Sequence, residues 1–409
     1  MLRMAHSCIL AVTALMIVAT AKLAIAAPVP EATALCSAMA QRVAPNDAAF
    51  LPSYPPDEGT NSRPEALKET AFVYDNALAV MAFIACGRIA EARTIGNALV
   101  TASKADRYYK DGRLRNAYRA GPVVSPPDLP GWWNPEAERW SEDEYQVSTA
   151  TGNVAWAGLA LLHLHDATGD AAYRDAALKL GLWLEALADP KAPGVTGGFS
   201  GFEPTPARVT WKSTEHNIDV AAVASWLFAE SNDERWTRLA ANARTFLDQM
   251  HDEQRGFRIG TDPQGKPAQG DMMMLDAQVW PLLLLPRGQR PESWNALPAL
   301  IDERLAVPGG YDFNGDRDGL WVEGSAQAAL MLALEGDESR SSQVLKSVLA
   351  ERDADTGWLF AARDKSISTG LAINADGSGG DFRYYRWPHL GATAWAVLAL
   401  QKHNPFRPD

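Results

Sequence analysis

The sequence lacks the features that mark two large classes of protein. Its 409 residues include 38 lysines and arginines against 50 aspartates and glutamates, which gives a formal net charge of −12. No cluster of basic residues occurs, and because phosphate backbones bind basic surfaces we expect no nucleic-acid partner. Beyond residue 26 no apolar run approaches ~20 residues, so we expect no membrane span in the mature chain.

The first 26 residues have the pattern of a signal peptide. Arg3 supplies a positive charge, residues 8–20 form an apolar run too short to cross a bilayer, and Ala24 and Ala26 place small residues at the cleavage position. We therefore expect residues 1–26 to be removed and residues 27–409 to form a single domain in the periplasm or outside the cell. An uncleaved membrane anchor is the alternative.

Cysteine is scarce as well. Cys8 belongs to the signal segment, which leaves Cys36 and Cys86 in a compartment that permits oxidation. Two interpretations stay open, a disulfide and a pair of buried thiols, because a Cα separation cannot be read from a sequence.

Strand-like alternation is also absent, whereas helical spacing is abundant. No segment alternates convincingly between apolar and polar residues, which argues against a β-sandwich. Segments with helical spacing recur in pairs, in which an apolar, alanine-rich helix precedes a more charged, amphipathic one. The predicted pairs are 69–85 with 89–104, 149–168 with 171–188, 213–230 with 233–250, 271–285 with 291–305, and 319–334 with 338–352, and a last apolar helix covers 390–402.

The number of predicted helices indicates a closed ring. Six apolar helices need six partners, and the segment 30–42 supplies the missing one by packing beside the last apolar helix. An apolar helix belongs inside and its charged successor outside. We therefore predict an all-α (α/α)6 toroid of six helical hairpins, almost wholly helical, with long loops at one mouth and short strands in the loop 194–210. An open solenoid is the rival architecture.

Polar residues gather where each apolar helix begins, which places them together at one mouth of the toroid. Capping explains one such segment, but carboxylates and amides buried in register on six helices cost several kcal/mol each unless they are paired or used. We therefore predict one shared site, with Asp75, Asn153, Glu215, Gln278 and Glu323 around one cavity. The predicted substrate-binding residues are Tyr74, Asn153, Trp211, His216, Asn217, Asp276, Gln278, Gln327, Tyr384, Tyr385 and His389.

Four carboxylates are the predicted catalytic residues. Glu215 and Asp219 stand four residues apart and so share one helical face. Two carboxylates in a low-dielectric cleft cannot both ionise freely, so the pKa of one rises and that group can act as a general acid near neutral pH. Asp75 and Glu323 begin other apolar helices at equivalent positions. Glycoside hydrolysis is the reaction that uses such carboxylate pairs, although a salt bridge in the helix wall is an equal alternative for Asp219.

No cofactor is predicted, with calcium as the one metal candidate. The histidines and cysteines show no zinc spacing. Oxygen-bearing side chains alternate in one loop as calcium requires, and Glu323 falls at the twelfth position. Arg317 departs from the pattern, because it replaces the glycine needed for the sharp turn. A polar turn before a helix is the alternative. The candidate calcium ligands are Asp312, Asn314, Asp316 and Asp318.

Four motifs together resemble those of bacterial secreted proteins in the six-hairpin glycosidase superfamily, over about residues 72–406. The resemblance implies an (α/α)6 toroid that acts on oligo- or polysaccharide through acidic residues at the mouth. Members include inverting hydrolases, unsaturated-uronide hydrolases, polysaccharide lyases and sugar epimerases, so the fold does not select the reaction. The motifs are Tyr74-Asp75-Asn76-Ala77-Leu78-Ala79 and the segments 112–118, 213–219 and 321–327.

The leading hypothesis is a glycoside hydrolase with Glu215 as acid and Asp75 or Glu323 as base. A lyase or epimerase on the same scaffold is the first competitor; one of the tyrosines or histidines at the mouth would abstract the proton. Its acidic substrate would be held by Lys212, Arg115 and Arg386. A non-catalytic glycan-binding factor for an exported polysaccharide is the second competitor. A terpenoid cyclase fits poorly, because an apolar substrate wants an aromatic cavity rather than amides and acids.

Overall fold

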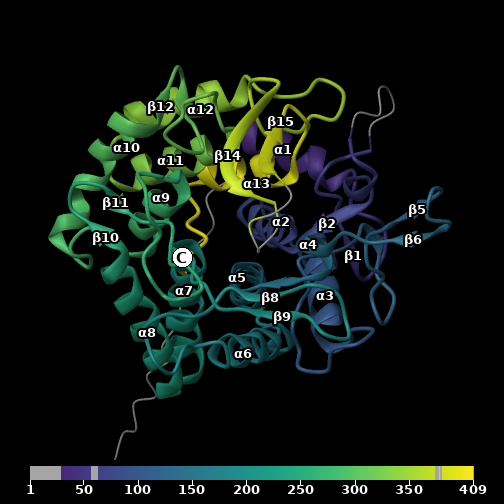
Figure 1. Ribbon diagram of the computed structural model, residues 1–409. Coiled ribbons are helices and arrows are strands. Elements are labelled where there is room, and N and C mark those ends of the chain that lie inside the picture. The colour runs from purple at the N-terminus through teal and green to yellow at the C-terminus, as the bar shows by residue number, and fades with distance from the viewer. Residues whose placement is uncertain (1–28, 57–62, 374–376, 378–379, 409) are drawn as a thin grey trace, which may run out of the picture.

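The inner layer of the molecule is a closed ring of six helices. The computed structural model describes residues 29–56, 63–373, 377 and 380–408 (Figure 1). The inner helices are α2 (Val73–Ala85), α5 (Thr151–Thr168), α7 (Thr214–Ser231), α9 (Leu275–Leu284), α11 (Val322–Leu334) and α13 (Leu390–Gln401). Each packs on the next in this order, and α13 packs back on α2. The predicted toroid is confirmed and the open solenoid is wrong. The predicted signal peptide, residues 1–26, lies outside the described residues.

The outer layer supplies one partner to each inner helix. Its members are α3 (Ile89–Lys104), α6 (Ala171–Glu185), α8 (Glu234–Met250), α10 (Leu297–Leu305), α12 (Glu338–Leu349) and α1 (Pro30–Ala40). The first helix, α1, packs on α13 and completes the sixth hairpin, as expected for the segment 30–42. A short helix, α4 (Glu144–Val147), lies in the loop before α5. Within the described ranges, no helix is long and apolar enough to cross a bilayer.

The two layers differ as their sequences predict. In α13 every residue from 390 to 399 is buried, because the helix is enclosed on all sides. In α8 the buried residues follow one stripe at helical spacing, and the opposite side is exposed. Local signals set the ends of α7, where the Ser213 side chain accepts a hydrogen bond from the backbone N–H of His216 and Asn232 adopts a left-handed conformation with φ 54°.

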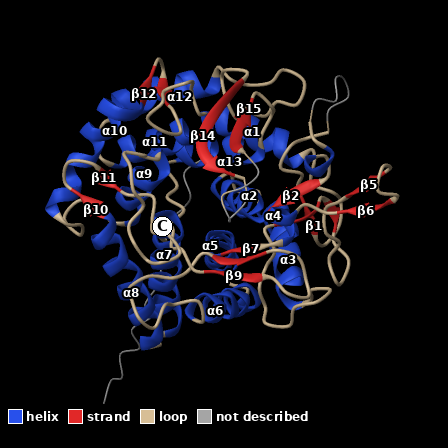
Figure 2. Cartoon of the chain, in the orientation of Figure 1, coloured by secondary structure: helices blue, strands red, loops and turns tan. Residues whose placement is uncertain are grey.

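The loops contain more strand than the sequence pattern indicated, so the expectation of an almost wholly helical domain is wrong. Seven small sheets occur among the described residues (Figure 2), and residues 70–72 at the start of the predicted helix 69–85 form a strand instead. Loop backbone groups that pack against the ring need hydrogen-bond partners, and short strand pairs provide them. The strands predicted in 194–210 are present as β8 and β9.

The strands pair antiparallel as β1–β4, β2–β3, β5–β6, β7–β8–β9, β10–β11, β12–β13 and β14–β15. Their bounds are β1 (Ala49–Phe50), β2 (Thr70–Phe72), β3 (Ala117–Arg119), β4 (Gly121–Pro122), β5 (Trp132–Asn134), β6 (Arg139–Ser141), β7 (Thr149–Ala150), β8 (Gly198–Ser200), β9 (Ala207–Val209), β10 (His251–Asp252), β11 (Gly256–Phe257), β12 (Ala306–Val307), β13 (Gly310–Tyr311), β14 (Ser366–Ala372) and β15 (Asp381–Tyr385).

The fourth residue of four inner helices anchors the loop that leads into the helix. In α2, Asn76 accepts a hydrogen bond from the backbone N–H of Leu51 at 2.9 Å and donates to the carbonyl of Leu51 at 3.0 Å. The same two-way pairing joins Asn217 to Val195, Gln278 to Phe257 and Ser325 to Tyr311. Each buried polar side chain is thereby satisfied, and each loop is held in register over the mouth.

Aromatic side chains fill the centre of the ring. The Trp156, Trp280 and Trp395 rings contact one another, with centroids 5.3 to 6.4 Å apart. The segment after α13 turns back into the ring, where the Phe406 ring lies 5.1 Å from Trp156 and 5.6 Å from Trp280. The Asn404 side chain fixes this segment by donating to the carbonyl of Leu283 at 2.8 Å. The centre of the toroid is therefore a packed floor beneath the mouth.

Of the two interpretations of the cysteines, the structure selects the disulfide. Cys36 in α1 is bonded to Cys86, which follows the last residue of α2, with the Cα atoms 6.7 Å apart. The bond ties the helix that closes the outer layer to the first inner helix.

Candidate active site

The second residue of the inner helices forms a ring of polar groups at the mouth. This position holds Tyr74 in α2, Gly152 in α5, Glu215 in α7, Asp276 in α9, Glu323 in α11 and Gly391 in α13. Because residues are spaced 100° apart around a helix, positions two and six point the same way and position four points to the opposite side. The ring at position two therefore faces the centre of the mouth, whereas the anchoring residues at position four face the loops.

Five carboxyl groups lie within electrostatic reach of one another at this mouth. We call Asp75, Glu215, Asp219, Asp276 and Glu323 the carboxyl cluster. Asp75 and Asp276 both raise the pKa of Glu323, and Asp276 raises the pKa of Glu215 and of Asp219. Asn153 lies at the edge of the cluster, because it bonds Tyr145, which is within electrostatic reach of Glu215 and Asp75.

His389 joins two members of the carboxyl cluster. It is the N-cap of α13, where its Nδ1 accepts the backbone N–H of Ala392 at 3.3 Å. Its Nε2 lies 3.4 Å from Asp75 Oδ2, and its Nδ1 lies 3.6 Å from Glu323 Oε2. Burial alone would lower the pKa of His389, but the attraction of the two carboxylates outweighs it and the pKa is raised. All three side chains are at most 5 % exposed, so their charges act in a low-dielectric setting.

A chain of hydrogen bonds fixes Glu323 from below. The Tyr74 hydroxyl donates to Glu323 Oε1 at 2.7 Å, and the Trp395 indole N–H donates to the Tyr74 oxygen at 2.8 Å. Gln327 donates to the same Glu323 oxygen at 3.4 Å and accepts from the Trp280 indole at 2.9 Å. Burial raises the pKa of Glu323 to about 7, with Asp75 adding to the rise and His389 opposing it. The carboxyl is therefore held rigidly and titrates near neutral pH.

Glu215 and Asp276 share a proton on the other side of the mouth. Burial raises the pKa of Glu215 well above its usual value, and its hydrogen bond to Asp276 raises it further because the protonated form donates. Burial also raises the pKa of Asp276, to about 6, although the bond from Glu215 opposes this. Asp219 lies one turn further along α7, buried beside Trp156, and burial again raises its pKa well above its usual value. All three pKa values on this side of the mouth are therefore raised, with burial as the largest cause.

Oxygens of the cluster are left with unfilled hydrogen-bonding capacity. Among the described residues, none forms a hydrogen bond within ordinary geometry to the buried Glu215 Oε1, and Asp75 Oδ2 and Glu323 Oε2 have only their longer contacts with His389, at 3.4 and 3.6 Å. A buried oxygen without a hydrogen bond costs ~1–3 kcal/mol, so weakly satisfied oxygens in one place indicate a site that receives hydroxyl groups or water.

Two glycines make room for the cluster. A methyl group on Gly391 would lie 2.8 Å from Asp75 Oδ1 and 2.8 Å from Glu323 Oε2. A methyl group on Gly152 would lie 2.5 Å from His216 Cδ2. Burial lowers the pKa of His216 to about 4, so this imidazole is neutral at pH 7.

The structure brings most predicted site residues together. The four catalytic candidates and Asp276 belong to the carboxyl cluster, and Tyr74 and His389 contact it directly. The Trp211 ring lies 5.9 Å from His216. The Tyr384 ring lies 6.2 Å from His389, and the nearby Glu323 and Asp75 charges add to the effect of burial in raising its pKa.

Four predictions for substrate-binding residues need correction. Asn217 and Gln278 are fully buried anchors of Val195 and Phe257 and face away from the mouth, so Gln278 does not surround the site with the others. Gln327 is also fully buried and supports Glu323 from below rather than meeting a substrate. Tyr385 follows Tyr384 on a strand and so points to the opposite face, where its ring stacks on Trp387 at 4.6 Å.

Sequence reasoning missed Tyr54 and the tryptophan floor. The Tyr54 ring stacks against the His389 ring at 5.0 Å, and burial, with the charges of Asp75 and Glu323, raises its pKa. Tyr54 lies in the proline-rich loop 51–56, outside every helix start, so the pattern that found the other residues could not find it. Trp156, Trp280 and Trp395 were not among the predicted site residues, yet their indole groups contact Asp219, Gln327 and Tyr74.

The three cations expected to hold an acidic substrate are engaged elsewhere. Arg115 is fully buried and paired with Asp106 at 2.6 Å. Lys212 pairs with Asp189 at 2.8 Å, and Arg386 pairs with Glu351 at 2.7 Å. The structure therefore contradicts their proposed role at the mouth.

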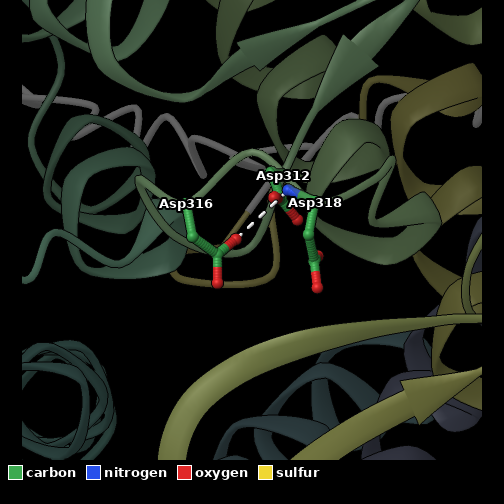
Figure 3. A group of neighbouring side chains, drawn as sticks. All are labelled: Asp312, Asp316 and Asp318. Atoms are coloured by element: carbon green, nitrogen blue, oxygen red, sulfur yellow. Dashed lines mark hydrogen bonds between the residues drawn. The ribbon is translucent and has the colours of Figure 1, made fainter.

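The calcium candidate is partly assembled. Oxygens of Asp312, Asp316 and Asp318 lie within 4.8 Å of one another (Figure 3). Arg317 adopts the left-handed conformation that the glycine would supply, with φ 55°, and its guanidinium points to the carbonyls of Glu303 and Arg304 at the end of α10. Glu323 is not a member of this group, because it faces Tyr74 and His389, so its assignment as the twelfth-position ligand is wrong.

Comparison with known proteins finds similarity in structure only. No family model and no curated protein matches the chain. An α-amylase from Clostridium perfringens is similar with TM-score 0.64 and 11 % identity, over 91 % of this chain and 97 % of the other. A glycosidase variant gives TM-score 0.60 and 14 % identity over 92 % and 97 % of the two chains. Cellobiose 2-epimerase from Spirochaeta thermophila is similar with TM-score 0.59 and 15 % identity, over 90 % of this chain and 92 % of the other. The chain therefore has the fold of the six-hairpin glycosidases.

Proposed function

We propose that the protein is a carbohydrate-active enzyme that hydrolyses glycosidic bonds in an oligo- or polysaccharide. The carboxyl cluster is the observation that supports this reaction most strongly. Its members come from four inner helices, and burial raises the pKa of Glu215 well above its usual value and that of Glu323 to about 7. A pair of carboxyl groups on separate inner helices can supply the acid and the base that glycoside hydrolysis needs.

In this proposal Glu215 is the general acid. Its proton is held by burial and by the hydrogen bond to Asp276, and its Oε1 has no hydrogen-bond partner among the described residues. With its proton on Oε1, Glu215 would donate it to the glycosidic oxygen as the bond from that oxygen to the anomeric carbon breaks, and the leaving sugar would depart as an alcohol. The charge left on Glu215 would be tolerated because Asp276, which titrates at about 6, can share the returning proton.

Glu323 is the general base, with Asp75 as its alternative. Glu323 is fixed by Tyr74 and Gln327 through Oε1, which leaves Oε2 to accept a proton from water. A pKa of about 7 is matched to base catalysis near neutral pH. His389 would stabilise the ionised form of Glu323 when its imidazole is protonated, since its Nδ1 lies 3.6 Å from Glu323 Oε2 and would then donate to that oxygen instead of accepting from the backbone N–H of Ala392.

A neutral sugar is the substrate unit that this mouth accepts best. Five carboxyl groups surround the reaction centre, and the arginines and lysine expected to hold a uronate are paired at other places. A carboxylate on the reacting sugar would meet repulsion from Asp75 and Glu323.

Epimerisation is a second candidate, and one observation favours it. The two histidines at the mouth have opposite pKa shifts, because burial lowers the pKa of His216 to about 4 while carboxylates raise that of His389. A neutral and a protonated imidazole are a base and an acid for moving a proton off and onto a sugar carbon. The similarity to a cellobiose 2-epimerase and to a sugar epimerase from a ruminal bacterium agrees with this alternative.

Incubation with a panel of neutral oligosaccharides in deuterated water separates these reactions. Hydrolysis produces shorter chains with new reducing ends and no deuterium on sugar carbons. Epimerisation keeps the chain length and places one deuterium at the inverted carbon. Substrate binding with neither product would show a non-catalytic glycan-binding protein. Glu215→Gln is the control for the first reaction and His389→Asn for the second.

Export to the periplasm or beyond is part of the proposal. The N-terminal 26 residues support it, and so does the bond between Cys36 and Cys86, since disulfides persist in oxidising compartments.

A further inference from the structure

A second pocket lies at the periphery of the toroid, beside the ends of α3 and α6, which pack on each other. It has a volume of about 620 Å³, which is in the range of small-ligand sites. Its lining contains five cationic and two acidic side chains, although the whole chain has a formal net charge of −12. The local charge is therefore opposite to that of the protein.

Four of the five cations have no acidic partner. Lys104 and Lys179 make no hydrogen bond or ion pair within the described part of the chain, and Lys110 and Arg208 donate only to neutral oxygens. The two acids of the lining are already neutralised, since Asp106 pairs with Arg115 and Asp111 with Arg113. Lysines and arginines without acidic partners give the pocket a net positive charge, which attracts an anion.

Arg113 adds a buried donor. It is 8 % exposed, and its guanidinium carbon lies 4.0 Å from the centre of the Tyr109 ring and 4.2 Å from that of Phe199. Its Nε and Nη2 bond Asp111, while its buried Nη1 has no hydrogen-bond partner among the described residues. A buried guanidinium that is stacked between two rings and unsatisfied on one side is suited to a planar anion.

The pocket opens on the same end of the molecule as the carboxyl cluster. Helix α2 ends at Ala85 and α3 begins at Ile89, so the two run antiparallel, and α3 ends at the level where α2 begins. The same holds for α5 and α6. A long ligand bound at the mouth could therefore extend toward the pocket along one end of the toroid, without crossing to the opposite end.

We propose that this pocket binds the anionic group, carboxylate or phosphate, of an acidic saccharide unit. The unit lies remote from the bond that reacts, so the substrate class is a polysaccharide with a neutral unit at the mouth and an acidic unit at a distance. The inference that the anionic group belongs to a saccharide rests on the proposed function, whereas the inference that the pocket binds an anion does not. A free inorganic anion such as phosphate could supply the same negative charge.

Isothermal titration of the intact protein tests the proposal without any turnover. The probes are a short oligogalacturonate, a neutral cello-oligosaccharide of equal length, and inorganic phosphate. The test variant combines Lys179→Gln with Arg208→Gln, two exposed side chains remote from the carboxyl cluster. The matched control combines Lys346→Gln with Arg238→Gln, which removes the same charge from α12 and α8 on other parts of the outer layer.

We expect oligogalacturonate to bind the native protein, to bind more weakly as salt rises, and to bind the test variant about tenfold more weakly, the scale for removing two partly exposed charges. The control should bind as the native protein does. Equal losses in both variants would overturn the proposal, because attraction would then follow total charge. Phosphate binding as tight as oligogalacturonate binding would overturn the saccharide carrier. Neither of these two results would argue against the proposed hydrolysis at the mouth, because the titration measures binding and not turnover.

Discussion

Adding one methyl group at Gly391 tests whether the mouth works as a tightly fitted unit. The methyl group of Gly391→Ala would lie 2.8 Å from an oxygen of Asp75, 2.8 Å from one of Glu323 and 2.9 Å from His389 Cε1. Ordinary contacts between such atoms need about half an ångström more, so the carboxylates must move outward. The position is helical and does not require a positive φ, so alanine is acceptable to the backbone.

The expected result is a loss of function with a modest loss of stability. Displacement of catalytic groups by up to ~1 Å costs up to ~100-fold in rate, so we expect turnover to fall at least ~10-fold. Overpacking costs about 1–3 kcal/mol, and the better helix propensity of alanine returns up to ~1 kcal/mol. The pKa of His389, followed by NMR, should fall as Asp75 and Glu323 move away.

Gly181→Ala is the matched control. A methyl group there would lie 2.4 Å from Leu227 Cδ1 in apolar packing between α6 and α7, away from the mouth. It should lower the melting temperature and leave turnover per folded molecule unchanged. If Gly391→Ala keeps turnover within about twofold of native and leaves the His389 pKa in place, the reasoning about the mouth is wrong.

Three further predictions concern stability. The pKa of Glu323 is raised from 4.5 to about 7, so between these pH values the folded state holds a proton that the unfolded state releases. The contribution of this proton to stability is complete below about pH 4.5 and is lost as the pH rises through 7. In urea unfolding, Glu323→Gln should therefore be about 3 kcal/mol more stable than the native protein at pH 8 but not at pH 4. Reduction of the Cys36–Cys86 bond, 50 residues apart, should cost about 4 kcal/mol, and an unchanged unfolding midpoint would contradict this. Calcium at the Asp312–Asp318 loop should raise the melting temperature, and Asp316→Asn should abolish the rise; no change on chelation would reject the metal.

The helical ring could be predicted because its signals are local. Apolar helices surrounded on all sides and amphipathic helices with one buried stripe differ in composition, and breaks such as Gly169 and Asn232 end helices in left-handed conformations. The loops were less predictable. Their short strands pair segments with few residues each, so no period of two could appear in the sequence.

Position along each helix decides which predicted site residues lie at the mouth. Glu215 and Glu323 stand second in their helices and reach the mouth, whereas Asn217 and Gln278 stand fourth and turn about 200° away. The sequence placed both sets at the same level, and treating them as one set was the error. Counting residues from each helix start would have separated them, but helix starts are known only to within a few residues before a structure exists.

Long-range contacts account for the remaining differences. Tyr54 reaches His389 from a loop more than 300 positions away, and Phe406 enters the floor from the segment after the last helix. Arg115 was interpreted as a ligand for an acidic substrate, yet Asp106 and Glu203 neutralise it in a buried pair. None of these partners is marked by a local pattern.

Turnover and melting temperature of Glu215→Gln test the central claim most directly. If Glu215 is the general acid, the variant should keep the fold and most substrate binding while turnover falls at least ~100-fold, the usual scale for a positioned proton donor. Its melting temperature should stay near the native value or rise, because the buried proton shared with Asp276 is replaced by an amide. Near-native turnover in well-folded protein would contradict the account and move catalysis to Asp75 and Glu323.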